Sequence, residues 1–319
     1  MDTTEVLGAV AHPGGLLVHR PELVVGVVRA ISTPWALEIE LQARRPLDHR
    51  GAAEVAPRRL LPAHDEGVDL RVAWLDETGH AHWEYALSSW SDSGDHVGGT
   101  SGHRVVFRFP PVFDEMSLVL AWPEIGFPET IVRLPLPDRA TVERTTISIW
   151  RAPLDVRPLP QGLTHHVAPH HDAPALETGT IAAPPLVLHR RVHRAAVVLT
   201  RLTVVGPGPV LSAELLCVAR GHAADVVNEH AFSDRQDTAP DDPARVRTSG
   251  PGAAVAVVQG SGAFWVRRGE LVASGGDQTF SCLQQLVLRR PEDGWLDLVV
   301  AWPLAGLGDV LVRVPLTSA

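Results

Sequence analysis

Lysine is absent from this 319-residue sequence, so all 28 basic residues are arginine. A high-GC coding bias explains such a composition, and selection for bidentate arginine contacts is the alternative. The net charge is −9 at pH 7, and no basic run is longer than Arg-Arg. A nucleic-acid-binding protein usually carries a basic face that neutralises phosphates. We therefore do not expect nucleic acid as a partner.

The sequence also lacks a long apolar run. No stretch approaches the ~18–20 residues that cross a bilayer as a helix. The acidic segment Met1–Glu5 lacks the basic start and apolar core of a signal peptide. We expect a cytoplasmic protein without a membrane span. Cysteine is scarce, and in a reducing compartment Cys217 and Cys282 are expected to be small core residues rather than a disulfide.

The familiar catalytic and cofactor motifs are missing as well. There is no Gly-x-Ser-x-Gly, no Walker loop, no Gly-x-Gly-x-x-Gly and no Cys-x-x-Cys. The chain has 16 histidines, so the joint presence of Ser, His and Asp means little. The missing motifs argue against an enzyme but do not exclude one. The sequence predicts no cofactor apart from the divalent metal considered below.

What the sequence does contain is a repeat. Residues 118–136 and 298–316 align without a gap at an offset of 180, and 10 of the 19 positions are identical. Weaker matches extend upstream, for example between Leu16–Arg20 and Leu186–Arg190. The offset changes only in segments rich in glycine, proline or charge. This behaviour predicts one fold copied twice, with insertions in loops.

Short apolar segments dominate each half. Leu37–Leu41 and Arg104–Phe109 alternate with period two, as half-buried strands do, and proline and glycine separate the segments. In the first half we expect strands near residues 16–20, 22–31, 35–44, 69–76, 81–87, 103–109, 116–122 and 129–135. Such strands without alternating helices predict an all-β chain of two tandem antiparallel β-sandwich domains, Ig-like or jelly-roll-like. A small barrel is the alternative.

The expected domains are 1–138 and 185–319, and the segment between them, 139–184, differs in composition. Thr141–Trp150 has strand character. Residues 151–185 are rich in proline and hold two His-His pairs, so they are expected to form an extended linker. In the second domain, residues 223–235 are expected to form a short helix with Asp225 and Glu229 on one face.

The motif Trp-Pro-x-x-Gly ends a strand in both copies. Proline cannot donate a ladder hydrogen bond, and glycine can adopt the positive φ of a tight reversal. We favour a β-hairpin with a structural tryptophan, and an exposed tryptophan that serves as a ligand platform is the alternative. The residues concerned are Trp122, Pro123, Gly126, Trp302, Pro303 and Gly306. Arg133 and Arg313 also occupy matched positions, as do Arg29 and Arg201. We expect these arginines on a solvated face of their strands, and a partner anchor is the alternative.

Histidine and acidic residues gather in the first half without counterparts in the second. His80 and His82 alternate on an expected strand, so both side chains point to one face, as zinc ligands on a sheet can. Asp92, Asp95 and His96 lie in a Ser/Gly-rich loop that could supply ligands to a divalent cation. These five residues are the candidate metal ligands, and ordinary solvated side chains are the alternative.

A resemblance rests on three features: the Gly-rich loop Gly98–Gly102, the strand that ends in Pro110-Pro111, and the Trp-Pro-x-x-Gly hairpin. Together they resemble a group of small single-domain actinobacterial β proteins, and this chain is similar to two fused copies of such a domain. The second copy departs from the pattern, because its loop is reduced to Gly275-Gly276 and Gly308 replaces Pro128. The resemblance implies a fold but no activity.

The sequence leaves three functions open. The first is a non-catalytic binding or scaffold protein, built as a pseudo-dimer of two β-sandwiches, that engages a protein partner and could gain avidity from two linked copies. The second is a metal-dependent enzyme or metal-binding sensor that uses the first-half His/Asp loops. The third is carbohydrate recognition through exposed Trp83 or Trp90. The partner and the oligomeric state are not fixed by the sequence.

Overall fold

The computed structural model describes residues 5–46, 70–92, 100–171, 175–206, 208, 210–231, 242–269 and 271–317. These residues form mostly β-strands in several antiparallel sheets, which confirms the predicted all-β class. Across these ranges, no helix has the length and apolar character needed to cross a membrane. The chain divides into an N-terminal unit, Gly8–Thr146 with Leu176–Thr180, and a C-terminal unit, Met1–Leu7 with Ile147–Ala175 and Ile181–Ala319.

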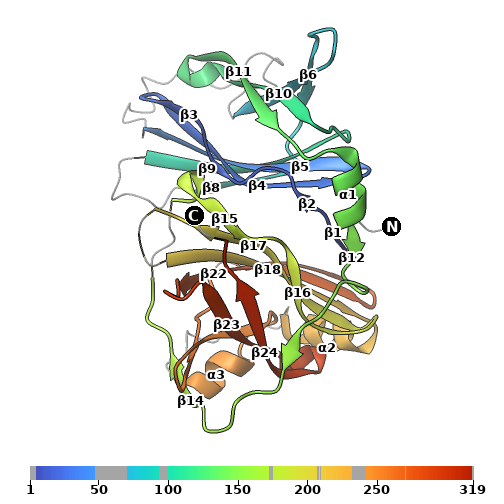
Figure 1. Ribbon diagram of the computed structural model, residues 1–319, viewed down its shortest axis with the longest axis vertical. Helices are drawn as coiled ribbons and strands as arrows, with labels where there is room; N and C mark the ends of the chain where they lie inside the picture. The colour runs from blue at the N-terminus through green and yellow to red at the C-terminus, as the bar shows by residue number, and fades with distance from the viewer. Residues whose placement is uncertain are drawn as a thin grey trace. The chain divides into compact units, whose positions relative to one another are not determined.

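The N-terminal unit contains two sheets (Figure 1). The first has the order β2-β4-β5-β9-β8, with β3 also paired to β4; these strands are Ala9–Val10 (β2), Gly15–Arg20 (β3), Leu23–Thr33 (β4), Ala36–Pro46 (β5), Ser88–Asp92 (β8) and Thr100–Phe109 (β9). The second has the order β11-β10-β6-β7; these strands are Arg71–Leu75 (β6), Ala81–Glu84 (β7), Glu115–Trp122 (β10) and Phe127–Pro135 (β11). Alternate residues of both sheets, such as Ile39, Phe107 and Leu118, form one shared core.

The C-terminal unit also contains two main sheets. The first has the order β15-β17-β18-β22-β21, with β16 paired to β17; these strands are Thr180–Ala183 (β15), Leu186–Arg191 (β16), Ala195–Val204 (β17), Val210–Arg220 (β18), Leu271–Gly276 (β21) and Thr279–Arg289 (β22). The second has the order β13-β24-β23-β19-β20-β14; these strands are Val156–Arg157 (β13), Thr164–Val167 (β14), Ala254–Gln259 (β19), Gly262–Trp265 (β20), Trp295–Trp302 (β23) and Leu307–Pro315 (β24). A short pair, β1 (Val6–Leu7) with β12 (Ile147–Ser148), completes the unit.

The two units have the same strand order when strands are matched in sequence. The series β3·β4-β5-β9-β8 corresponds to β16·β17-β18-β22-β21, and β11-β10-β6-β7 corresponds to β24-β23-β19-β20. Irregularities also match: the β4/β5 register shifts between Val27 and Arg29, and the β17/β18 register shifts between Leu199 and Arg201. Because a bulge depends on local backbone geometry, its recurrence at matched positions shows that the ladders agree in detail.

Arg29 and Arg201 lie beside these bulges, and the predicted solvated face is wrong for them. Arg29 pairs in register with Glu40, and its Nε lies 3.3 Å from Glu40 Oε2. Arg201 is 1% exposed and pairs with Glu214, with 3.9 Å between Nη2 and Oε2. Arg104 also binds the Glu40 carboxylate. A buried charge needs an opposite charge or several hydrogen bonds, so each arginine belongs to the scaffold.

The predicted strand at Thr141–Trp150 is wrong over its first half. Residues Arg139–Thr145 form helix α1, and only Ile147–Ser148 are in a strand. The side chain of Asp138 accepts a hydrogen bond from the Thr141 backbone N–H at 2.8 Å and so caps the first turn. This cap, together with burial of Val142, outweighs the strand preference of the β-branched residues.

The expected helix at 223–235 is confirmed over His222–Ala231 (α2), and its remaining residues lie outside the described ranges. A second helix, α3, spans Pro243–Thr248. After α3 the chain enters β19 through a buried turn whose carbonyls are bound by side chains. Arg268 donates to the carbonyls of Ser249, Gly252 and Ala253, and desolvation lowers the pKa of its guanidinium to about 10. Arg268 therefore remains charged at neutral pH and holds α3 next to β19.

We predict that removing one partner of a buried pair costs more stability than removing one partner of a surface pair, because a buried charge is left uncompensated. Glu40→Gln removes the carboxylate that Arg29 and Arg104 share and leaves Arg29 paired with Glu38 alone, so it should lower the free energy of unfolding by about 3 kcal/mol. Chemical denaturation followed by tryptophan fluorescence measures the change. The matched control is Asp297→Asn, which breaks the exposed pair with Arg313 and should cost less than about 1 kcal/mol. Equal small effects in the two variants would contradict the prediction.

Candidate functional site

The repeated hairpins have the same geometry in both units. Pro123–Ile125 and Pro303–Ala305 form single 3-10 turns (η2 and η4), and the glycine that follows has φ 71° in Gly126 and 75° in Gly306. Trp122 and Trp302 are both 0% exposed. The Trp302 indole donates to the Pro251 carbonyl at 2.7 Å. Neither indole presents a face to solvent, so neither ring forms a ligand platform in this structure.

His80 and His82 belong to the β6–β7 hairpin, where Asp76 organises the turn. The Asp76 carboxylate accepts hydrogen bonds from the Thr78 hydroxyl (2.6 Å) and the His80 backbone N–H (3.0 Å), and it contacts His82 Nε2 at 2.9 Å. The His82 ring stacks on Trp74 with 4.5 Å between centroids, and His80 meets it edge-on at 4.9 Å. One nitrogen of His82 is therefore already engaged by a carboxylate.

The other predicted metal ligands are not brought to this hairpin in the described ranges. Asp92 ends β8, which lies in the other sheet, and Asp95 and His96 lie outside the described residues. Within the part of the chain that is described, no group of three or more His, Cys, Asp or Glu side chains could hold a metal ion. The five-residue metal site thus stays a prediction from sequence.

Trp83 and Trp90, the residues proposed for carbohydrate recognition, are both half-buried. The guanidinium of Arg71 lies over the Trp83 ring at 4.3 Å from its centroid, and that of Arg104 lies over Trp90 at 5.4 Å. An arginine on a ring face competes with a sugar for that face. The two rings come from strands of different sheets, β7 and β8, so they do not form one continuous aromatic strip on a single sheet.

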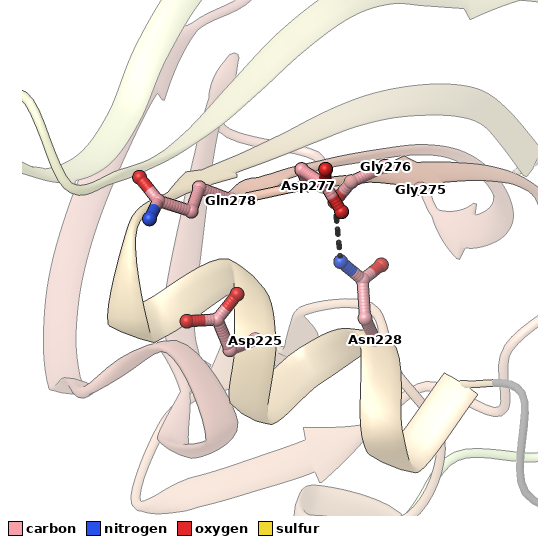
Figure 2. A pocket seen from close by; sticks show the side chains of 6 residues that line it. All are labelled: Asp225, Asn228, Gly275, Gly276, Asp277 and Gln278. Carbon is pink, nitrogen blue, oxygen red and sulfur yellow. Dashed lines mark hydrogen bonds between the residues drawn. The ribbon is translucent and has the colours of Figure 1, made fainter.

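A pocket of about 610 Å³ lies between α2 and the β21–β22 turn (Figure 2). The Asn228 side chain donates to the carbonyls of Gly276 (3.2 Å) and Thr279 (3.1 Å) and so ties the helix to the turn. The Asp225 side chain extends from the helix, and Asp277 lies on the turn. Two carboxylates give the pocket a negative character that would attract cations. Asp225 is exposed to solvent, however, and nothing in the pocket selects a ligand.

The outer face of the second C-terminal sheet is covered by its own unit. Ala256, Ala263, Trp265 and Val299 form a small cluster with Val246 of α3 on the side opposite the main core. Two residues of the inter-domain segment, Leu159 and Val167, pack against this cluster. Trp265 is 1% exposed as a result. The same segment supplies β13, which pairs with β24, and β14, which pairs with β20, so both edges of the four shared strands have a partner.

The matched sheet of the N-terminal unit differs at both edges. Its order is β11-β10-β6-β7, and no described strand pairs with the outer side of β11 or of β7. Trp83 is half-buried at the position of Trp265. Ile131 is 61% exposed, whereas its counterpart Leu311 packs against the covered cluster. Tyr85, just beyond β7, is 83% exposed. The surface around β7 is therefore the strongest candidate site.

This edge is not evident from the sequence. A signal was present, because Ala81-x-Trp83 matches Ala263-x-Trp265 at an offset of 182, between the offsets of the neighbouring strands. Three residues with two identities are too short to align alone. The structure assigns the match because Trp83 pairs with Ala73 on β6 and Trp265 pairs with Ala256 on β19.

Comparison with known proteins adds little. No family model matches this chain. A search of curated proteins also finds no match. Among solved structures, a conserved domain protein from Bacillus anthracis is similar with a TM-score of 0.23 and 11% identity, over 92% of this chain and 77% of that one. Bovine butyrophilin gives a TM-score of 0.21 and 10% identity, over 98% of each chain. Scores this low carry no information about function.

The hydrogen bonds of the Asp76 carboxylate predict how the stability of the protein depends on pH. Hydrogen bonds from Thr78 first, then His82 and His80, hold the pKa of the Asp76 carboxyl well below its ordinary value of 3.8. A lowered folded-state pKa gives stability that is complete above the ordinary value and is lost as the pH falls through the folded-state pKa. Asp76→Asn should therefore lower the Tm at neutral pH, and the difference from wild type should persist to pH 3.8 and shrink only below it.

Thermal unfolding at several pH values measures this difference. Glu77→Gln, which changes the exposed neighbouring residue of the same turn, is the matched control and should leave the Tm unchanged. A difference that already disappears above pH 3.8 would show that the Asp76 carboxylate is not stabilised in the folded hairpin.

Proposed function

We propose that this chain is a non-catalytic, cytoplasmic binding or scaffold protein. It consists of two β-sandwich domains, Ig-like or jelly-roll-like, that arose by internal duplication and engage a protein partner. The identical strand order and matched bulges support the duplication. The observation that carries the binding function is the difference at β7, whose counterpart β20 has a strand of its own chain on its edge.

An unpaired strand edge presents a row of backbone N–H and C=O groups, and it pairs readily with another chain. Proteins usually protect such edges with lysine, proline, bulges or a covering segment. β11 carries Pro128 and Pro135, whereas β7, with the sequence Ala-His-Trp-Glu, has no proline or lysine and is limited instead by its four-residue length and by Glu84. Exposed apolar side chains flank it, with Tyr85 83% and Leu87 59% exposed. Large exposed apolar side chains around an open edge favour a protein-binding surface.

The two copies are not equivalent in this proposal. In the C-terminal unit the inter-domain segment occupies the edge, and in the N-terminal unit no described strand pairs with the same edge. A pseudo-dimer with two identical sites would gain avidity, whereas this asymmetry supports one principal binding edge and one structural edge.

Site-specific photo-crosslinking tests the function. A photoreactive amino acid at Tyr85, next to β7, should give a discrete protein adduct in lysate of the native organism. The same amino acid at Val192, which is 55% exposed in the C-terminal unit, is the matched control and should not give that adduct. The adduct should persist when lysate metal ions are chelated, which separates protein binding from the metal-dependent alternative. The absence of any adduct above the Val192 control would contradict the proposal.

A further inference from the structure

The two cysteines of the chain face each other inside the C-terminal unit. Cys217 on β18 pairs in register with Cys282 on β22, and these strands are neighbours in one sheet (Figure 1). Both thiols are free, and the two residues are 0% and 1% exposed. Paired residues on antiparallel strands have Cα atoms about 4.5–5.5 Å apart, within the ~4.4–6.8 Å that a disulfide spans. The pair can therefore close without a change of strand register.

Polar groups surround the Cys217 sulfur. The Ala253 backbone N–H donates to Cys217 Sγ at 3.4 Å, and the Cys282 thiol donates to the same sulfur. Arg268 Nε donates to the Ala253 carbonyl at 3.4 Å, and its positive charge acts on the sulfur. Gln284, which is 0% exposed, donates to that carbonyl at 3.0 Å. The Ala253 peptide is thus held through its carbonyl while its N–H binds the sulfur.

These groups favour a negative charge on Cys217. The hydrogen bond from Cys282 lowers the pKa of Cys217, and the Ala253 N–H and the Arg268 charge add to this effect against the opposing effect of burial. The same thiol–thiol hydrogen bond, together with burial, raises the pKa of Cys282, which stays protonated. The thiolate is the nucleophilic form of cysteine. The pair therefore combines an attacking sulfur with a protonated partner.

The N-terminal unit has no such pair at the matched positions. The matched bulges align β5 with β18. By this alignment Ala43 takes the position of Cys217, and its partner His103 takes the position of Cys282. The shared ladder forms in that unit without thiols. The dithiol is therefore a feature of one unit and not a requirement of the scaffold.

We propose that Cys217 and Cys282 form a redox modification site, at which hydrogen peroxide converts the pair to a reversible disulfide between β18 and β22. The Cys217 thiolate attacks one peroxide oxygen, the O–O bond breaks and hydroxide leaves, so that Cys217 becomes a sulfenic acid. The Cys282 sulfur then attacks the Cys217 sulfur. The S–S bond forms, and the sulfenic hydroxyl leaves as water with the proton of Cys282. The two sulfurs lose two electrons, and the peroxide gains them.

Burial determines which reagents reach the pair. Hydrogen peroxide is little larger than water, so small local openings of the unit admit it, whereas bulky thiol reagents need a larger opening. The Cβ atoms of opposite residues are about 4.5–5.5 Å apart, and an average disulfide needs ~3.8 Å. Closure therefore draws the strands together, and a strained disulfide is readily reduced. This inference goes beyond the proposed protein-binding function and does not rest on it.

Thiol counting on the full chain tests the proposal. Reduced protein is exposed to hydrogen peroxide under native conditions, denatured, and treated with N-ethylmaleimide, and the adducts are counted from the intact mass. Protein without peroxide should carry two adducts, one for each cysteine. Peroxide-treated protein should carry none, and dithiothreitol should restore both. The native reduced protein should not react with the bulky aromatic disulfide dithionitrobenzoate in the time that peroxide needs to close the pair.

Variants assign the role of each group. In Cys282→Ala, peroxide with dimedone should place a sulfenic-acid adduct on Cys217, whereas in Cys217→Ala the same treatment should leave Cys282 unmodified. Arg268→Gln should slow disulfide formation by about tenfold or more, because the thiolate loses its neighbouring positive charge. Arg313→Gln is the matched control, since it breaks an exposed pair with Asp297 in the same unit and should not change the rate.

Several outcomes would overturn the inference. Two adducts after peroxide treatment would show that the buried thiols are inert, and adducts that dithiothreitol does not restore would show irreversible oxidation. A disulfide-linked dimer would show that cysteines of different copies react. A dimedone adduct on Cys282 alone would reverse the order of attack, and an unchanged rate in Arg268→Gln would remove that residue from the site. Thiol counting uses the unaltered protein and stays decisive if a variant is unstable.

Discussion

A strand at the end of a sheet must find partners for its outward backbone groups or leave them to water, and this constraint shapes both units. In the C-terminal unit the inter-domain segment supplies these backbone partners at both edges, because β13 pairs with β24 and β14 pairs with β20. The same segment covers the outer face, because Leu159 and Val167 pack against the cluster that contains Trp265. A proline-rich stretch with the composition of a spacer is therefore part of the second fold. Its composition suits this role, because proline ends each short pairing and keeps the chain extended between them.

The N-terminal unit satisfies the constraint in a different way at each edge. β11 carries two prolines, which cannot donate and so blunt the edge. β7 is only four residues long and turns into the exposed Tyr85. A short strand limits edge-to-edge aggregation without closing the edge. Inside each unit, the buried Arg–Glu pairs beside matched bulges fix the register of the long central strands, so differences at the edges do not disturb the shared ladder.

Much of the fold was predictable because it depends on local pattern. Segments such as Leu37–Leu41 alternate with period two wherever one face is buried, and they are strands in the structure. The wrong predictions arose where a non-local or capping interaction prevailed. Asp138 caps a helix in a stretch whose β-branched residues favour a strand. Arg201 is buried because Glu214, on the neighbouring strand, neutralises it. Neither side-chain contact can be inferred from the composition of its own segment.

The candidate site was harder to predict, for a related reason. The tripeptide Ala81-His82-Trp83 does not stand out in the sequence. It draws attention only because its counterpart β20 pairs with β14, about a hundred residues away along the chain. Such long-range parallel pairing leaves no periodic signal in either partner. The matched strand order of the two units supplies the missing information. Since both units follow one strand order, the β14–β20 pair of the C-terminal unit shows where a further strand joins this sheet. The Trp-Pro-x-x-Gly hairpins have the same turn geometry in both units and cannot provide this contrast. Features that the two units share belong to the scaffold, so a site is best sought where their described strands differ, as they do beside β20 and β7.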